Sequence, residues 1–590
     1  MESLPKPQDI FDTILIVNAV KKVKSGDAEY VSGILQQAFG KKILEIHVID
    51  AQKLVFGINF DQAEDISSKI IRGPHPKAED APDFLKFWNN MSTIHRFADG
   101  SLAEGIDLKT DNPVIETAQL ALQIHYDPKV SIELACRDIN SIFEIGGKEL
   151  PQADPQSAFD ELTTKLITLQ DLTISISNVI PISPFLRKTA VFPYSLVSEK
   201  SDYNSLAPEV IKIIIKLEGF SAWPTRQREV VPFKVAAFLS ISKALAKLNI
   251  ESRTTPTGIE ILFRGYVFSA VGIHNNELTD FEGTAYGKQL EQLERIDRLQ
   301  HANVLAMSNK YNSFSVAVRA AIRWMRCKCV ASELFTSEAI ELLMIYIYEN
   351  TVPPKFAFTA FTRFLSLLSH LDDTHQNVFS ILEASPDLSH DDKRLLVVAA
   401  PHCRKSEYTI RGPSQSVIRY IRAAARDSLK TIVERELKTA QHQATLEKVF
   451  GTPTNKWNFV IKVNHKERPF AGRVIFSKQN FHGKYDVRGS GVAPKLDNLM
   501  PGFDPVHMLV EEIAERYGTV LSIWYNEFGG PSIGLSLSED TLNKELPLEP
   551  QNMNSAKLSE SGKLKLDVED VMQQIRIIGG DIIKSLDHKL

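Results

Sequence analysis

Residues 210–218 read VIKIIIKLE, and this run of β-branched side chains predicts a buried strand. Between residues 230 and 248 apolar side chains recur roughly every 3.6 positions, which predicts a helix. Two further β-rich runs, 259–263 and 266–273, are joined by Arg264-Gly265 and predict a hairpin. A strand, a helix and a hairpin in this order indicate a small α/β domain.

The chain that follows is expected to be helical. Three amphipathic segments lie at 314–330, 337–348 and 356–371, and a long charged helix is expected at 415–438. An all-apolar run at 395–400 suits a buried strand. An α/β domain followed by a helical domain is the order found in nucleotidyltransferases, so the sequence points to that class of fold.

Catalysis by this class requires two carboxylates that alternate on one strand and face the same divalent metal ions. On the candidate strand the alternating positions hold Lys212, Ile214 and Lys216, and the two lysines would repel a metal. Asp280 and Glu282 have the required spacing, but the residues before them are typical of a loop. An active metal-dependent nucleotidyltransferase that uses Asp280 and Glu282 on an RNA 3′ end remains the alternative.

The chain has 590 residues, which at about 150 residues per domain corresponds to roughly four domains. Hairpins are expected at 43–60 and 521–537, and Asp504-Pro505 is typical of the start of a helix. We expect an α+β multidomain protein. Its regions are 1–165 (mixed), 166–300 (nucleotidyltransferase-like), 301–450 (helical), 451–540 (α+β) and 541–590 (a polar tail).

Composition excludes several classes of protein. The 68 lysines and arginines are balanced by 73 aspartates and glutamates, so nucleic-acid binding would need a local basic surface. The four cysteines, Cys136, Cys327, Cys329 and Cys403, fit a reducing compartment and no zinc site is expected. Phosphate-loop, serine-hydrolase and zinc-protease motifs are absent from the sequence, as is an apolar stretch of the length that membrane spans need.

One stretch is similar to a known family. FLKFWNNMSTIHRFADGSLAEGIDL, residues 84–108, resembles a conserved segment of the nucleolar RNA-associated protein (Nrap) family of small-subunit ribosome assembly factors. The matching positions are Phe84, Phe87, Trp88, Arg96, Phe97, Asp99, Gly100 and Glu104.

Four further stretches resemble the same family in the same order. They are ISPFLRKTAVFP (182–193), LEGFSAWP (217–224), NSFSVAVRAAIRWMRCKCVASELFTSEAIELL (312–343) and GFDPVHMLVEEIAERYGTVLSIWYNEFGGPSIGL (502–535). Because the matches are ordered and extend from residue 84 to residue 535, the resemblance covers most of the chain.

The resemblance implies a pseudo-nucleotidyltransferase α/β domain followed by a helical poly(A)-polymerase/OAS-like domain, flanked by α+β domains, with 1–165 similar to the family's third domain. It implies a chain that is not an enzyme, holds no cofactor or metal, and acts as a scaffold of the small-subunit processome in the nucleolus of the nucleus. The implied partners are pre-rRNA, a small nucleolar ribonucleoprotein and processome proteins, including an Rrp-type assembly factor and casein kinase subunits, with no membrane.

The resemblance covers only the C-terminal half of the family's tandem architecture, so it implies that the first module is missing. Contacts made by that module are therefore in doubt for this chain. A third interpretation, a fragment without a function of its own, stays open because half of a tandem architecture would expose the surface that once packed on the other half.

A local basic stretch at 456–495 is the first candidate RNA-binding surface. Aromatic residues, among them Trp457 and Tyr485, alternate with its charges, as stacking on exposed bases would need. A solvated charged face over core aromatics is the alternative interpretation. The candidate residues are Lys456, Lys462, Lys466, Arg468, Arg473, Lys478, Lys484, Arg488 and Lys495.

A second candidate RNA-binding face lies on the helix at 314–330. Arg319, Arg323 and Arg326 share one side of that helix, which would either line an old substrate cleft or form a solvated face. In the 84–108 stretch the aromatic residues are expected to pack in a core, and Arg96 and Asp99 are expected to form a polar pair.

Overall fold

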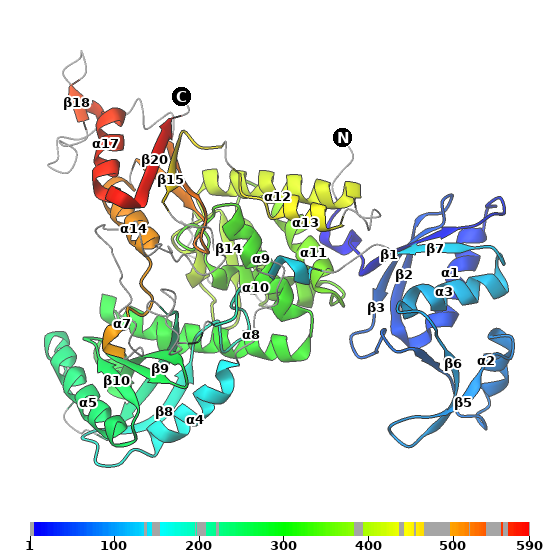
Figure 1. Cartoon of the computed structure of the whole chain (residues 1–590), viewed down its shortest axis with the longest axis horizontal. Coiled ribbons are helices and arrows are strands. Elements are labelled where there is room, and N and C mark those ends of the chain that lie inside the picture. The colour runs from blue at the N-terminus through cyan, green and yellow to red at the C-terminus, as the bar shows by residue number, and fades with distance from the viewer. Residues whose placement is uncertain are drawn as a thin grey trace.

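The computed structural model describes residues 5–134, 139–143, 154–194, 196, 208–219, 223–382, 393–435, 442–453, 456–464, 496–518, 520–537, 556–558 and 564–588. Figure 1 shows a helical domain in the middle of the molecule, with an N-terminal domain, an α/β domain and a C-terminal domain around it. Within the described ranges, every helix is too short or too polar to cross a membrane.

The N-terminal domain contains a four-stranded antiparallel sheet in the order β2-β3-β1-β7. Its elements are β1 (Thr13–Asn18), α1 (Asp27–Phe39), β2 (Ile43–Asp50), β3 (Val55–Phe60), α3 (Pro113–His125) and β7 (Ser131–Leu134). Helices α1 and α3 lie on one side of the sheet, away from the helical domain (Figure 1), and their apolar residues form a core with the strands. The predicted hairpin at 43–60 is confirmed as β2 and β3.

The stretch 84–108 lies in a smaller part of this domain, a three-stranded sheet in the order β4-β6-β5. Its elements are β4 (Ile70–Arg72), α2 (Ala81–Phe87), β5 (Thr93–Arg96) and β6 (Leu102–Asp107). Phe87 and Trp88 are buried, as expected for core residues. The expected Arg96–Asp99 pair is wrong, because Asp99 instead accepts a hydrogen bond from Arg72 at 3.0 Å.

The α/β domain is built on a five-stranded sheet in the order β10-β11-β12-β9-β8. The stretch VIKIIIKLE forms the long inner strand β9 (Val210–Glu218), which pairs in parallel with β12 and antiparallel with the edge strand β8. The predicted hairpin is confirmed as β11 and β12. The other elements are α4 (Pro155–Ile167), β8 (Ser175–Pro181), α5 (Gln227–Lys247), β10 (Glu251–Thr254), β11 (Gly258–Phe263), β12 (Tyr266–His274), α6 (Asn275–Asp280) and α7 (Ala285–Glu291).

The helical domain holds the largest apolar core of the described residues. Its predicted helices are confirmed as α9, α10, α11 and α12, and the run at 395–400 is a buried strand. A π-helical turn, η5 (Gln292–Asp297), leads into it. The elements are α8 (Arg298–Lys310), α9 (Phe314–Cys327), α10 (Ser337–Asn350), α11 (Ala357–Ser369), β13 (Asn377–Ser380), β14 (Leu396–Ala399), α12 (Gln415–Arg435) and α13 (His442–Val449).

The C-terminal domain has a four-stranded antiparallel sheet in the order β16-β17-β15-β20. Asp504 caps the helix that follows it, as predicted. The expected polar tail at 541–590 is wrong for its last part, because β20 completes the sheet and α17 carries buried apolar residues. The elements are β15 (Phe459–Val463), α14 (Pro505–Tyr517), β16 (Leu521–Tyr525), β17 (Ser532–Leu537), β18 (Ala556–Leu558), β19 (Leu564–Leu566), α17 (Val568–Gly579) and β20 (Ile583–His588).

The first and last domains share one topology, strand–helix–strand–strand–helix–strand, with the same strand order and antiparallel pairing. In the first sheet Ile14 pairs with Gly57, and in the last sheet Val460 pairs with Gly534. Phe11 lies three positions before Ile14, and Trp457 lies three positions before Val460. Each aromatic ring covers the glycine of its pair so closely that a Cβ on that glycine would lie 2.2 Å from a ring atom. The chain therefore contains an internal structural repeat.

Candidate functional site

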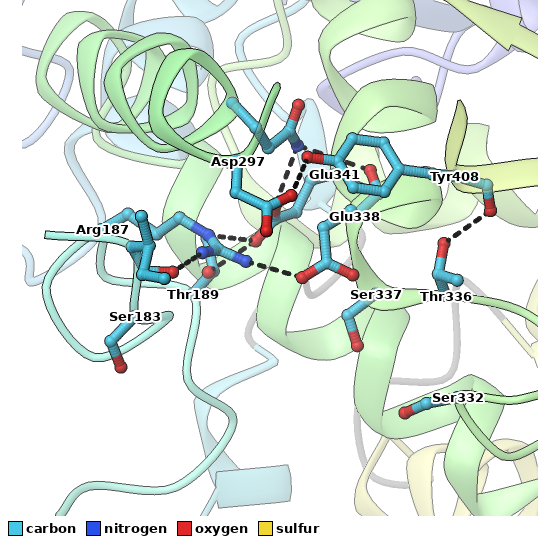
Figure 2. Close-up of polar contacts among 12 residues, drawn as sticks. Ser183, Arg187, Thr189, Asp297, Ser332, Thr336, Ser337, Glu338, Glu341 and Tyr408 are labelled. Carbon is cyan, nitrogen blue, oxygen red and sulfur yellow. Dashed lines mark hydrogen bonds and ion pairs between the residues drawn. The ribbon is translucent and has the colours of Figure 1, made fainter. Parts of the chain in front are cut away.

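The α/β domain and the helical domain meet at a buried ionic network (Figure 2). Arg187 follows β8 and is buried, with its Nη1 donating to the backbone oxygen of Ile182 at 2.8 Å. Its Nε donates to Oε1 of Glu341 at 2.8 Å, and its Nη2 donates to Oε1 of Glu338 at 3.2 Å. Both glutamates lie on α10, so a single guanidinium joins the two domains.

Further hydrogen bonds hold Glu341, whose side chain is 0% exposed. Thr189 Oγ1 donates to Oε1 at 2.7 Å, and Gln300 Nε2 donates to Oε2 at 2.9 Å. Burial by itself lowers the pKa of Arg187, but the carboxylates of Glu341 and Glu338 outweigh it and raise that pKa. The network is thus a satisfied, charged pair in the interior.

A second acidic group lies at the same boundary. Asp297, in η5, accepts hydrogen bonds from Tyr408 Oη at 2.9 Å and from Gln292 Nε2 at 2.8 Å. Burial raises the pKa of Asp297, and burial together with the neighbouring Asp297 raises the pKa of Tyr408. The tyrosine hydroxyl therefore stays a hydrogen-bond donor to this carboxyl group.

Two neutral histidines lie near the network, His301 on α8 and His402 in the loop after β14, but neither ring nitrogen of His301 has a hydrogen-bond partner among the described residues. His402 contacts Gln300 Oε1 through Nε2 at 2.7 Å and Asn303 Nδ2 through Nδ1 at 2.9 Å. Burial lowers the pKa of His402 to about 4. Burial and the nearby Arg187 charge lower the pKa of His301 to about 4 as well, so neither ring carries a charge at neutral pH.

A second buried arginine fastens the N-terminal domain. Arg363, on α11, is 1% exposed, and its Nε donates to the backbone oxygen of Ile10 at 2.9 Å. Beside it, Lys355 Nζ donates to the backbone oxygens of Asp61, Gln62 and Glu64 at 2.8, 2.8 and 2.7 Å. One loop of the N-terminal domain is thereby held against the helical domain.

A third buried arginine fastens the C-terminal domain. Arg326, on α9, is 0% exposed and forms an ion pair with Glu527, which lies in the loop between β16 and β17. Its Nη1 donates to the backbone oxygens of Val330 and Phe335, each at 2.9 Å. The expectation that Arg326 faces RNA or solvent is wrong, because the neighbouring domain covers it.

The two other arginines of that helix face make internal contacts. Arg319 Nη2 donates to the backbone oxygen of Val191 at 2.9 Å, and its guanidinium lies 4.2 Å from the centre of the Phe143 ring. The Arg323 guanidinium lies 5.1 Å from the Phe192 ring. Burial lowers the pKa of Arg319 to about 10 and also lowers that of Arg323. These two side chains thus lie at the boundary with the α/β domain, against the segment that follows β8.

The alternative catalytic pair is not assembled on a strand. Asp280 ends the short helix α6, Glu282 lies in the turn after it, and both are exposed. On β9, Lys212 is exposed, whereas Lys216 is buried and lies 3.1 Å from Glu294. Among the described residues, no group of three or more acidic, histidine or cysteine side chains is arranged to hold a metal ion.

Family models match nearly the whole chain in order. They describe Nrap protein domain 3 (residues 21–126), nucleotidyltransferase domain 4 (146–323), PAP/OAS1-like domain 5 (311–452) and domain 6 (454–586). The chain belongs to the Nrap family. The fold class predicted from the sequence, an α/β nucleotidyltransferase-like domain followed by a helical domain with α+β flanks, is confirmed by these matches.

Curated Nrap relatives resemble the chain over most of its length. Nucleolar protein 6 of Mus musculus is 23% identical over 613 residues, which cover 92% of this chain and 52% of the relative. U3 small nucleolar RNA-associated protein 22 of Schizosaccharomyces pombe is 21% identical over 643 residues, covering 95% and 56%. The chain therefore spans about half the length of these relatives. The expected nucleolar location is confirmed by them.

Among solved structures, the E. coli MS115-1 protein CdnC with ATP matches 51% of this chain and 91% of its own, at 18% identity and a TM-score of 0.35.

The basic stretch of this Nrap chain is described only at its start. Lys456 is exposed and lies 5.3 Å from the centre of the Tyr420 ring, and Lys462 pairs with Asp587 at 2.6 Å. Trp457 is 4% exposed, so this aromatic residue packs in a core instead of stacking on bases. The other candidates, Lys466, Arg468, Arg473, Lys478, Lys484, Arg488 and Lys495, lie outside the described residues.

Arg187 and Arg363 were not predicted as functional residues from the sequence. Arg363 stands alone in the apolar helix AFTAFTRFLSLLS, and a lone charge on such a helix indicates a buried partner. Arg187 lies in the family-like stretch 182–193, but nothing in the local sequence indicates its role, because its partners Glu338 and Glu341 lie about 150 residues further along the chain.

Proposed function

We propose that this Nrap chain is a non-catalytic scaffold of the small-subunit processome that assists pre-rRNA processing and small ribosomal subunit biogenesis. The observation that carries the proposal is the set of three buried arginines, Arg187, Arg326 and Arg363, each at a different boundary of the helical domain. The names of the relatives, nucleolar protein 6 and U3 small nucleolar RNA-associated protein 22, support the assignment to ribosome biogenesis.

The mechanism would be positional. Each arginine fixes one neighbouring domain in a single orientation, because a guanidinium that bridges two partners tolerates little displacement. Surfaces on different domains would then be held at fixed separations, and RNA and proteins bound to them would be kept in register without a covalent step.

The absence of catalysis is part of the proposal. A two-metal mechanism needs free carboxylates facing a shared site. At the boundary of the α/β and helical domains, Glu338 and Glu341 are instead bound to Arg187. Asp280 and Glu282, the pair required by the alternative, point from a helix end and a turn. The geometry therefore favours the scaffold over the enzyme.

The proposed partners are pre-rRNA and the U3 small nucleolar ribonucleoprotein, with the stretch 456–495 as the RNA-binding surface. Its basic side chains greatly outnumber its acidic ones in a chain of net charge −5. The Rrp-type assembly factor and the casein kinase subunits stay predictions from the family resemblance.

The test is ultraviolet crosslinking of the tagged chain in cells, followed by sequencing of the attached RNA. A Lys478/Lys484/Arg488→Ala variant is compared with a matched control, Arg226/Arg228/Lys247→Ala, which removes the same charge from exposed positions on and just before α5. Pre-rRNA and U3 reads that fall only in the first variant support the proposal. Absence of RNA above background, or equal loss in both variants, contradicts the RNA-binding surface.

Catalysis is tested separately with the full chain, Mg²⁺ or Mn²⁺, labelled nucleoside triphosphates and an RNA oligonucleotide. We expect no transfer to the RNA 3′ end. Metal-dependent transfer that Asp280→Asn or Glu282→Gln abolishes would overturn the non-catalytic assignment.

A further inference from the structure

The internal repeat shows which part of the C-terminal domain its fold does not require. In the first repeat, eight residues (19–26) connect the first strand, β1, to the first helix, α1. In the second repeat the equivalent connection, from β15 to α14, has 41 residues (464–504). Most of the basic stretch 456–495 lies in this insertion. Connections longer than about 15 residues usually carry a function or link separate parts of a molecule.

The described end of the insertion, residues 496–503 (the strap), lies on the α/β domain. It begins with a short 3₁₀ helix, η8 (Leu496–Asn498), beside the edge strand β10 (Figure 1). Leu496 and Leu499 are each 2% exposed and form an apolar cluster with Val267 of β12, separate from the main core of that domain. The strap therefore packs on the α/β domain before the chain enters the C-terminal domain at α14.

Hydrogen bonds fasten the strap to the same edge of the sheet. Glu251 Oε2, on β10, accepts from the backbone nitrogen of Leu496 at 2.9 Å. Arg253 Nη1, also on β10, donates to the backbone oxygens of Leu496 and Leu499, each at 3.3 Å. Polar and apolar contacts thus hold the same residues of the strap.

The insertion is consequently fixed at two points that belong to different domains. At its start, Val463 ends β15 within the C-terminal sheet. At its end, Lys495 directly precedes the strap, and the backbone nitrogen of Gly502 donates to the oxygen of Pro208, just before β9, at 2.8 Å. The sequence between these two points, 465–495, contains seven lysines and arginines and two acidic residues.

We propose that the strap, with Glu251 and Arg253, positions the basic segment 465–495 to bind single-stranded RNA. The proposal rests on the RNA-binding function proposed above for this stretch, and it gives the α/β domain the role of an anchor. Fixing one end of the segment in the free protein reduces the conformational entropy that is lost when RNA binds. Because the two ends are fixed on the C-terminal and α/β domains, both domains hold the bound RNA.

The test measures the affinity of the full chain for a fluorescently labelled single-stranded RNA of mixed sequence at several salt concentrations. Leu496→Ala/Leu499→Ala, the strap variant, removes the apolar contacts of the strap without changing the charge of the chain. Arg253→Met removes hydrogen bonds to the strap from the side of the sheet. The matched control is Leu239→Ala/Leu248→Ala, which truncates two leucines on and just after α5 that are each 48% exposed.

Two further measurements separate positioning from a general loss of structure. Hydrogen exchange in the free strap variant should become faster in the strap and stay unchanged in β9 and β12, which verifies that the α/β domain still folds. The strap variant is also combined with the charge variant Lys478/Lys484/Arg488→Ala, because two changes that act through one segment are not additive.

We expect RNA affinity to fall about tenfold in the strap variant and in Arg253→Met, because residues of the strap then have to be ordered when RNA binds. The salt dependence of binding should keep its slope, since the basic side chains of the segment are all retained. The control should bind RNA as the unchanged chain does. Once the charge variant is in place, the strap variant should cause no further loss.

The contrary results are distinguishable. If the charge variant lowers RNA affinity and the strap variant does not, the positioning role is overturned and the RNA-binding surface stands. Unchanged hydrogen exchange in the strap, or an equal loss of affinity with and without the charge variant, would overturn the positioning role as well. If the charge variant leaves RNA affinity unchanged, the proposed RNA-binding surface itself is wrong, and the positioning role is wrong with it.

Discussion

Arg187→Met would release the contact between the α/β and helical domains. The variant leaves Glu341, whose side chain is 0% exposed, without its cation, although Thr189 and Gln300 still donate to it. Removing one partner of a buried ion pair costs about 3 to 5 kcal/mol. Glu338 adds little to this cost, because its side chain is 32% exposed and solvent screens it.

Hydrogen exchange measured by mass spectrometry can locate this loss, which a single unfolding midpoint of a multidomain chain cannot. We expect peptides from α10 to exchange at least about 100-fold faster in Arg187→Met, since about 1.4 kcal/mol corresponds to tenfold. Arg187→Met/Glu341→Gln should recover part of the protection, because the double variant leaves no buried charge unpaired.

The matched control is Lys430→Met, which breaks the surface pair with Glu434 on α12, where the two side chains are 69% and 58% exposed. Surface pairs of this kind contribute well under about 1 kcal/mol, so exchange in α10 should not change. If Arg187→Met altered α10 no more than Lys430→Met does, the network would not hold the domains together and the structural basis of the scaffold would be refuted.

Three further predictions concern other parts of the molecule. Arg326→Ala should weaken the packing of the C-terminal domain on the helical domain by about 3 kcal/mol or more, because it leaves Glu527 without its cation. Limited proteolysis should then be faster around Glu527 and unchanged in the N-terminal domain, and equally faster cleavage in both domains would contradict this prediction. Gly534→Ala should lower stability by about 1 to 3 kcal/mol, because its Cβ would meet the Trp457 ring, and calorimetry showing an unchanged transition would argue against that packing. Burial lowers the pKa of His301 to about 4 in the folded chain. Below about pH 6.5 the unfolded chain therefore binds a proton at this residue that the folded chain does not bind. The free energy of unfolding should fall as the pH falls from 6.5 to 4, by about 2 kcal/mol at pH 5. His301→Leu should remove that part of the pH dependence of the urea midpoint, and an unchanged pH profile would show that His301 is not the group responsible.

Much of the fold is predictable from local patterns. The strand at 210–218, the hairpin predicted at 259–273 and the helices α9, α10 and α11 follow from periodicity, because each element buries its own apolar face. The strand β20 was missed because its polar sequence IKSLDH carries no strand signal, and its place in the sheet depends on pairing with β15, more than 100 residues earlier.

The candidate site was less predictable for a related reason. A helical wheel places Arg326 on a polar face, and only the folded chain brings Glu527 to cover it from 201 residues away. The internal repeat is likewise invisible to periodicity, since the residues that define it, Phe11 with Gly57 and Trp457 with Gly534, share a register and not a sequence.

Arginine at all three domain boundaries can be understood by comparing how polar and apolar contacts depend on the relative position of two domains. An apolar interface stabilises association but permits sliding, since its strength depends on buried area and not on direction. A buried ion pair adds little net stability, because desolvation offsets most of the attraction, but it is lost when the partners move apart. Arg187 and Arg326 therefore act mainly on orientation, and Arg363 does so through directional hydrogen bonds, among them one to the backbone oxygen of Ile10. An enzyme whose substrate enters between two domains needs one of these boundaries to open, whereas a scaffold needs all of them to stay closed.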